Sequence, residues 1–350
     1  MPQHPKGKGL DCLPFRGEDA WRTVRHPQGG PHALGPAPAR RRSATGPVRG
    51  QAAVSTPGGA QDRPTVAPAR LAAAAAAHHE GLEVSVCCGR AGAPPAVTHR
   101  ADRPHYAASM IKLAVLLAAH RAGALDRAVP VREEFASAAG GTYRADRAYD
   151  NDDEPWRHLG GEMTVRRLCH RMICSSSNLA TSVVLEHLGM EQVAAACPEG
   201  LVVQRPIGDR AAAEAGLTNT VTARAAVQVV QALLDTGDPR LLRPLREQRY
   251  THEIPAALPP GTPVANKNGW VTGVLHDVAL VEPPEAPPYL LAVCVAGGPQ
   301  ERARSAIHRV AEASWLDRRL LAPAASWAGA SGADTTDAGT TGAGAPEGEE

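Results

Sequence analysis

The strand-like segments of this chain lie at the two ends of its patterned region, and this placement limits the folds open to it. Two runs of strand-forming residues come early, at 82–88 and 96–101, and three come late, at 264–271, 275–281 and 290–296. Only turns separate the late runs, which predicts consecutive antiparallel strands. A single sheet containing all five must therefore be assembled from both ends of the region.

The long stretch between the two groups of strands has helical periodicity. Residues 110–122 are almost wholly apolar, which is typical of a helix buried on all sides. Residues 165–173 carry apolar side chains at i, i+3, i+4, i+7 and i+8, which is one face of an amphipathic helix. Together with the strands, this pattern predicts an α+β fold. Further helices are expected at 64–79, 179–188, 222–234 and 299–321.

The patterned region is expected to form one domain, from 64 to 322. Residues 1–63 are rich in Pro, Gly, Arg and Gln and have no periodicity, so a disordered leader is predicted. Residues 323–350 are Ala, Gly, Thr and acidic residues, and a disordered tail is predicted there. Because Phe, Tyr and Trp make up only 3% of the chain, the core must be built from Ala, Leu and Val.

Charge and composition exclude several partners. A net charge of +1 gives no overall attraction to nucleic acid or to an anionic membrane. No apolar run reaches the roughly 18 residues of a membrane span, and the N-terminus lacks the apolar segment of a signal peptide. Taken literally, the sequence predicts a cytoplasmic protein, but a misassigned start would leave localisation open. Seven cysteines without a C-x-x-C argue against a disulfide framework, and Cys87 and Cys88 should face opposite sides of a strand.

Lysine is rare in this chain, which uses arginine almost everywhere a positive charge is needed. Only four lysines occur, and only Lys112 and Lys267 fall within the patterned region. Arginine cannot lose its proton in a protein, whereas a desolvated lysine can. Proton-transfer chemistry is therefore the first hypothesis for these two residues.

The first candidate motif is Ser109-x-x-Lys112, at the start of the apolar helix. A spacing of three places both side chains on one helical face, roughly 5–6 Å apart at Cβ. A serine hydroxyl is a poor nucleophile until a base removes its proton, and a buried neutral lysine can be that base. The ordinary alternative is a serine that caps the helix.

The second candidate is Ser176-Ser177-Asn178, in a short break between two predicted helices. A serine hydroxyl there can relay a proton, and an asparagine amide can both donate to and accept from a substrate amide. The ordinary alternative is capping of the following helix by Ser177 or Asn178.

The third candidate is Lys267-Asn268-Gly269, on a predicted strand. Glycine lets a substrate backbone approach the strand, and lysine offers a positive charge to a carboxylate. The ordinary alternative is a polar edge strand.

Together, in this order, the three motifs resemble those of the penicillin-recognising serine enzymes, and of class A β-lactamases in particular. The flanking residues 172–175 and 276–279 are also similar to that family, and the resemblance covers roughly 64–322. It implies a β-lactamase/DD-peptidase-like fold, in which an antiparallel sheet of about five strands is flanked by helices. The active site would lie between this sheet and an all-helical subdomain.

The resemblance also implies roles for the site residues. Ser109 would attack an amide carbonyl and form an acyl-enzyme, with Lys112 as base and Ser176 passing the proton to the leaving nitrogen. Asn178 and Lys267 would hold the substrate.

The third motif would supply further substrate contacts through Asn268 and Gly269. The oxyanion would be bound by the backbone N–H of Ser109 and of a strand residue near Val271. The substrate would be a β-lactam or a peptide-like amide, with no metal, cofactor or nucleic acid. A monomer is expected, and relatives are usually exported.

Three positions depart from the family pattern. Ser177 stands where aspartate is usual, and Asn268 replaces the Thr or Ser hydroxyl that helps to bind the substrate carboxylate. The Glu-x-x-Leu-Asn segment whose glutamate activates the deacylating water is missing. The nearest candidate is Glu214 in Glu-Ala-Gly-Leu-Thr-Asn, and Glu199 is a second carboxylate in range.

These departures leave three functions open: β-lactamase-type hydrolysis, acylation without efficient turnover, and DD-peptidase activity. Two other polar segments are not expected to bind a metal. Residues 78–80 are expected to be a polar helix end. The acidic residues 150–154 lack the pattern of a calcium loop and are expected to form a solvated loop.

Overall fold

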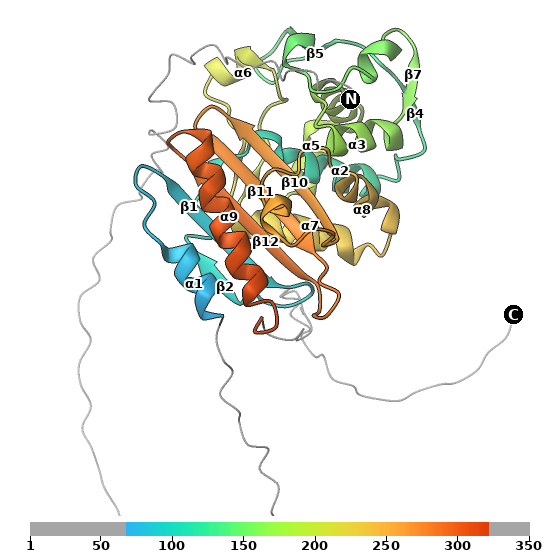
Figure 1. Ribbon diagram of the computed structural model, residues 1–350. Helices are drawn as coiled ribbons and strands as arrows, with labels where there is room; N and C mark the ends of the chain where they lie inside the picture. The colour runs from blue at the N-terminus through green and yellow to red at the C-terminus, as the bar shows by residue number, and fades with distance from the viewer. Residues whose placement is uncertain (1–67, 322–350) are drawn as a thin grey trace, which may run out of the picture.

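A five-stranded antiparallel sheet lies at the centre of the structure, a computed structural model that describes residues 68–321 (Figure 1). Its strands are β1 (Glu83–Arg90), β2 (Val97–His99), β10 (Val264–Val271), β11 (Val274–Val281) and β12 (Tyr289–Ala296). Their order is β10-β11-β12-β1-β2. Strand β1 pairs along its whole length with β12, so the sheet is built from both ends of the domain. This confirms the predicted α+β class.

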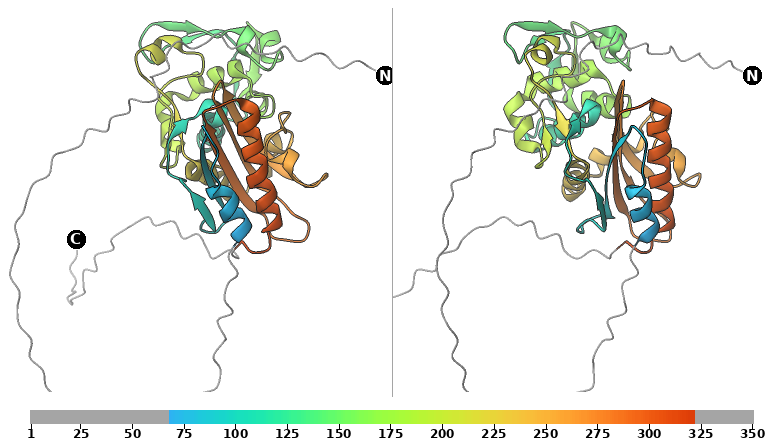
Figure 2. Two further views of the ribbon diagram at one scale, coloured as in Figure 1. Left: turned by 60° about the vertical axis from the view of Figure 1, so that its left-hand side comes forward. Right: turned by 90° about the vertical axis from the view of Figure 1, so that its left-hand side faces the viewer.

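Helices α1 (Ala69–Ala76) and α9 (Gln300–Leu316) cover one face of the sheet, as the edge-on view in Figure 2 shows. Leu71 of α1 and Ile307 and Val310 of α9 are buried there against the strands. These side chains belong to the first of two apolar cores, and their burial away from water stabilises the packing of the helices on the sheet.

The other face of the sheet packs against α7 (Ala223–Asp235), and α2 (Ile111–Arg121) packs against α7 in the same apolar core. Successive side chains of a strand point to opposite faces, so Cys87 lies in this second core and Cys88 in the first. Both thiols are free, as predicted. The second core continues into the helical part of the molecule, whose helices pack around α2, so the side chains of α2 are apolar.

The helical part lies beside the sheet (Figures 1 and 2). Its helices are α3 (Val165–Cys174), α4 (Asn178–Leu188), α5 (Met190–Ala196), α6 (Arg210–Glu214) and α8 (Pro239–Arg246). The sequence did not predict its short strands: β3 (His105–Tyr106), β4 (Ala128–Pro130), β5 (Glu134–Ala136), β6 (Thr142–Arg144), β7 (Glu162–Thr164), β8 (Leu201–Val202) and β9 (Thr220–Val221). Such two- and three-residue strands are too short to leave a periodic pattern.

Local capping fixes the break between α3 and α4. Helix α3 ends at Cys174, and Ser177 begins α4 by accepting a hydrogen bond from the Ala180 N–H at 3.1 Å. The capping alternative is therefore correct for Ser177. Ser176 lies in the break with φ 55°, a conformation uncommon for a residue other than glycine.

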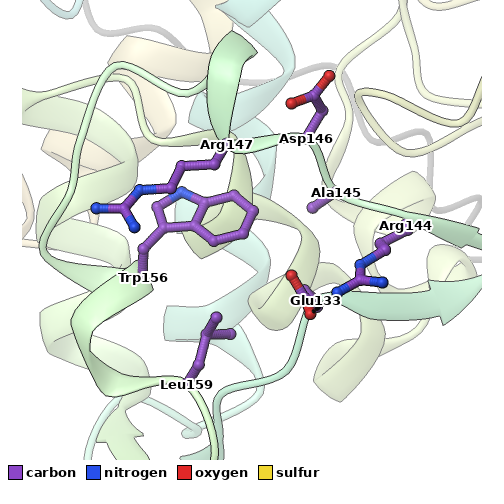
Figure 3. A pocket seen from close by; sticks show the side chains of 7 residues that line it. All are labelled: Glu133, Arg144, Ala145, Asp146, Arg147, Trp156 and Leu159. Atoms are coloured by element: carbon purple, nitrogen blue, oxygen red, sulfur yellow. Dashed lines mark hydrogen bonds and ion pairs between the residues drawn. The ribbon is translucent and has the colours of Figure 1, made fainter.

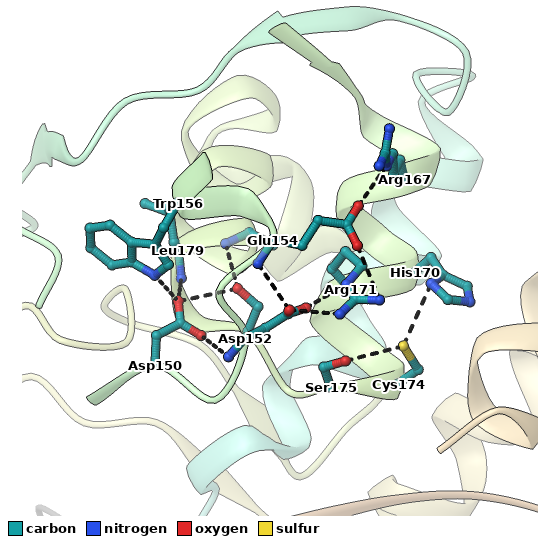
Figure 4. A network of polar contacts seen from close by, with 12 residues as sticks. Asp150, Asp152, Glu154, Trp156, Arg167, His170, Arg171, Cys174, Ser175 and Leu179 are labelled. Atoms are coloured by element: carbon teal, nitrogen blue, oxygen red, sulfur yellow. Dashed lines mark hydrogen bonds and ion pairs between the residues drawn. The ribbon is translucent and has the colours of Figure 1, made fainter. Parts of the chain in front are cut away.

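The acidic residues 150–154 do not form the solvated loop that we expected. Asp152 is buried and forms an ion pair with Arg171, while Asp150 accepts hydrogen bonds from the start of α4 (Figure 4). The sequence predicted a solvated loop because the arginine and the backbone amides that bind these carboxylates lie elsewhere in the chain.

Two of the predictions lie outside the described residues, namely the leader 1–63 and the tail 323–350. Within residues 68–321, no helix is both long enough and apolar enough to cross a bilayer.

Candidate active site

Ser109 lies in a 3-10 turn, Ala108–Met110, that leads into α2 and packs against strand β10. Its side chain caps no helix, which rules out the capping alternative for this residue. The preceding Ala108 has φ 46°, and backbone strain of this kind is common where a reactive side chain is held in a fixed direction.

Gly269 makes the close packing of the turn on β10 possible. A Cβ added there would lie 3.1 Å from the backbone N of Ser109 and 3.2 Å from that of Met110. Both distances are shorter than an ordinary contact of a Cβ atom, so a side chain at this position would press the turn away from the strand. Val271, the expected second oxyanion donor, is the last residue of β10 and is 40% exposed.

A chain of hydrogen bonds joins the three motifs. The Ser176 hydroxyl lies 3.1 Å from Ser109 Oγ, and Lys112 Nζ lies 3.1 Å from Ser176 Oγ. Lys267 Nζ reaches the same Ser176 Oγ from the strand side, at 3.2 Å. Ser176 is thus the common neighbour of the serine and both lysines, and it links Lys112 to Ser109.

Asn178 completes the surroundings of Lys112. Its side-chain oxygen accepts from Lys112 Nζ at 2.9 Å, and the Ser176 carbonyl accepts from the same nitrogen at 2.7 Å. The side-chain nitrogen of Asn178 donates to the Tyr149 carbonyl at 2.7 Å. The amine is therefore held in place by neutral acceptors.

Burial dominates the protonation of both lysines. The pKa of Lys112 is held well below its ordinary value by desolvation and next by the charge of Lys267, with Asp150 acting in the opposite direction. Desolvation lowers the pKa of Lys267 to about 7, although Asp277 and Glu253 oppose it. A lysine whose pKa is lowered gives up its proton more readily and can then act as a base, as the hypothesis for Lys112 requires.

The sequence did not predict a role for Glu253, which binds the third motif. This buried side chain accepts a hydrogen bond from the Asn268 side-chain nitrogen at 3.0 Å through Oε2. Its other oxygen lies 3.5 Å from Arg304 of α9. No motif identifies Glu253, because its position depends on how a turn packs against β10.

Asp150 is the second residue that the sequence analysis missed. One oxygen accepts from the N–H of Asn178 at 3.1 Å, and the other accepts from the N–H of Leu179 at 2.8 Å and from the Ser177 hydroxyl at 3.2 Å (Figure 4). Trp156 Nε1 also donates to it, at 3.0 Å. Asp150 thus brings a carboxylate to Ser177, the position at which the family pattern has aspartate. The missing aspartate in the sequence was the signal that could have led to a search for a substitute such as Asp150.

Glu214 is not brought into this cluster. It ends α6, its side chain is 65% exposed, and it forms an ion pair with Arg210 at 3.0 Å. Among residues 68–321, no hydrogen bond or ion pair joins it to Ser109, Lys112 or Ser176. The expected role of Glu214 as deacylation base therefore has no support in this geometry.

One surface hollow lies apart from the motifs. Its lining includes the Trp156 ring and the ion pair of Glu133 with Arg144 (Figure 3). None of the motif residues lines it. A group of three or more His, Cys, Asp or Glu side chains placed to hold a metal ion is also absent between residues 68 and 321.

The sheet, the helical part and the three motifs that meet between them define a class A β-lactamase-like serine enzyme. Residues 68–316 match the beta-lactamase enzyme family, and the chain belongs to that family. It is accordingly a β-lactamase-like, penicillin-recognising serine hydrolase by family. No curated protein matches the chain.

Solved structures with the same fold include β-lactamases and a penicillin-binding protein. A β-lactamase from Sphaerobacter thermophilus DSM 20745 is 24% identical with a TM-score of 0.58, over 73% of this chain and 97% of that one. One from Desulfarculus baarsii DSM 2075 is 25% identical with a TM-score of 0.56, over 71% and 96%. The structure of PBP-A is 19% identical with a TM-score of 0.58, over 71% and 94%.

Replacing Asp150 by alanine should destabilise the fold by about 1–3 kcal/mol, because two backbone N–H groups at the start of α4 lose their acceptor. Urea unfolding measures the change in the free energy of unfolding. Asp153→Ala is the matched control, since this carboxylate is 61% exposed and contacts only Arg147. Equal effects of the two substitutions would show that Asp150 does not hold the start of α4.

Gly269→Ala should slow the reaction of Ser109 with a penicillin by about 10²-fold, because the new Cβ pushes the Ser109 turn away from β10. Stopped-flow labelling with a fluorescent penicillin measures the rate. Gly161→Ala is the control, since its Cβ would only come to ordinary contact, 3.4 Å from the His158 carbonyl. An unchanged rate for Gly269→Ala would refute the importance of this close approach.

Proposed function

We propose that Ser109 is acylated by β-lactams or related amides, and that Lys112 accepts its proton through Ser176. The observation that carries this proposal is the chain of contacts from Ser109 Oγ to Ser176 Oγ to Lys112 Nζ, each 3.1 Å long. A buried neutral amine at the end of such a chain is a suitable general base. Amide substrates follow from the family to which the chain belongs.

In the first step Ser109 Oγ bonds to the carbonyl carbon of the substrate. Its proton moves to Ser176 as the proton of Ser176 moves to Lys112, which becomes an ammonium ion. The oxyanion is held by the N–H of Ser109 and by a second N–H of β10. Gly269 is the β10 residue next to the Ser109 amide, so this second donor should lie close to it, nearer than the expected Val271.

In the second step the carbon–nitrogen bond breaks and the proton returns from Lys112 through Ser176 to the leaving nitrogen. The acyl-enzyme remains on Ser109, and Lys112 is again neutral. Asn178 and Lys267 border the space beside these groups and would hold the substrate. Because Lys112 must be neutral to accept the proton, acylation slows as the pH falls through its lowered pKa.

The fate of the acyl-enzyme separates two candidate functions. Efficient β-lactamase hydrolysis needs a base that activates water, and the expected base, Glu214, is engaged with Arg210 at the surface. This observation favours slow deacylation, so that the protein behaves as a penicillin-binding protein. Hydrolysis of D-Ala-D-Ala peptides by the same acyl-enzyme route is the remaining alternative.

Mixing the protein with a penicillin should add the mass of one penicillin to the intact chain, and the adduct should persist for many minutes. Intact-protein mass spectrometry followed over time measures both. Ser109→Ala should give no adduct, and Glu214→Gln should decay at the wild-type rate. A wild-type protein without any adduct would refute the acylation proposal.

Rapid clearance of the adduct with accumulation of hydrolysed drug would contradict slow deacylation. It would identify a β-lactamase instead. Loss of that clearance in Glu214→Gln would restore the role that the sequence suggested for this residue.

A further inference from the structure

The middle residue of the third motif, Asn268, is held in a fixed orientation by Glu253. A carboxylate only accepts hydrogen bonds, so the Asn268 side-chain nitrogen must face Glu253 Oε2, 3.0 Å away. The Asn268 side-chain oxygen then lies on the side of Lys267, 3.5 Å from its Nζ. Both Asn268 and Glu253 are buried, so water does not compete for these contacts.

This orientation changes what the motif offers to a substrate. A Thr or Ser hydroxyl, the usual residue in the family pattern, can turn its proton toward a carboxylate. Asn268 instead presents a carbonyl oxygen next to Lys267 and commits one of its N–H bonds to Glu253. A carbonyl oxygen attracts a hydrogen-bond donor and repels a carboxylate.

The charge of Glu253 acts in the same direction. Glu253 places a buried carboxylate one hydrogen bond away from Asn268, and this carboxylate is paired with Arg304 only at 3.5 Å. Asp277 is a second buried acid, paired with Asn268 across β10 and β11. Burial raises the pKa of Asp277 to about 8, with the Glu253 charge as the second cause, so Asp277 is mostly protonated at neutral pH and adds little negative charge.

We infer that the substrate group bound beside Asn268 is an uncharged hydrogen-bond donor, such as a primary carboxamide, rather than a carboxylate. The inference rests on the proposed function for the reaction at Ser109. It narrows the substrate class to neutral or amidated compounds. A substrate amide N–H would donate to the Asn268 side-chain oxygen, and no negative charge would be brought toward Glu253.

Equilibrium binding to the Ser109→Ala protein tests the inference separately from catalysis. The probes are a penicillin with its free carboxylate and the same penicillin with a carboxamide in its place. The carboxamide should bind at least tenfold more tightly. Tighter binding of the carboxylate, or equal binding of the two, would overturn the inference.

Two further substitutions in the Ser109→Ala protein test the cause. Glu253→Gln removes the negative charge, and Asn268→Thr restores a hydroxyl; each should move the preference toward the carboxylate by about tenfold or more. Glu191→Gln is the control, because it removes the same charge from an exposed site on α5. A preference that neither of the first two variants alters would overturn the assignment to Asn268 and Glu253.

Acylation of the wild-type protein by the two probes tests the proposed function itself. If neither compound acylates Ser109, the proposed reaction is wrong. The inferred preference for an uncharged group is decided separately, by the binding measurement on the Ser109→Ala protein.

Discussion

The complete burial of the Lys112 amine is the constraint on which the rest of the site depends. An ammonium ion in that position would lose its hydration, so burial lowers the pKa of Lys112 and favours the neutral amine that the proposed reaction needs. The position exists because α2 is enclosed by the helices α3, α4, α5 and α7, and α7 separates it from the sheet. Ser176 and Asn178 then provide the neutral groups that keep the amine beside the Ser176 hydroxyl.

The sheet and the three motifs could be predicted because their signals are local. Strand alternation and turns mark β10, β11 and β12, and the S-x-x-K spacing follows from one turn of a helix. The two carboxylates that complete the site could not be found in this way. Asp150 lies 28 positions before Asn178 and Glu253 lies 15 before Asn268, so packing alone brings each pair together.

The contacts of Asp150 and Glu253 explain the two positions, Ser177 and Asn268, at which the motifs depart from the family pattern. The carboxylate missing at Ser177 is supplied by Asp150, which binds the same turn from a neighbouring segment. The hydroxyl missing at Asn268 is not replaced, because Glu253 holds the amide with its oxygen toward Lys267. The first contact holds the turn that carries Ser176 and Asn178, whereas the second fixes the orientation of the third motif, where we infer that the substrate is selected.

The central claim is that Lys112 is neutral in the resting protein, and a titration of its side chain tests this most directly. The chain has only four lysines, so an NMR titration of protein labelled with 13C at lysine Cε resolves few signals. Lys112→Arg assigns one of them. That signal should titrate well below the ordinary lysine pKa of about 10.4. A titration in the ordinary range would contradict the account, because a protonated Lys112 cannot take the proton of Ser109.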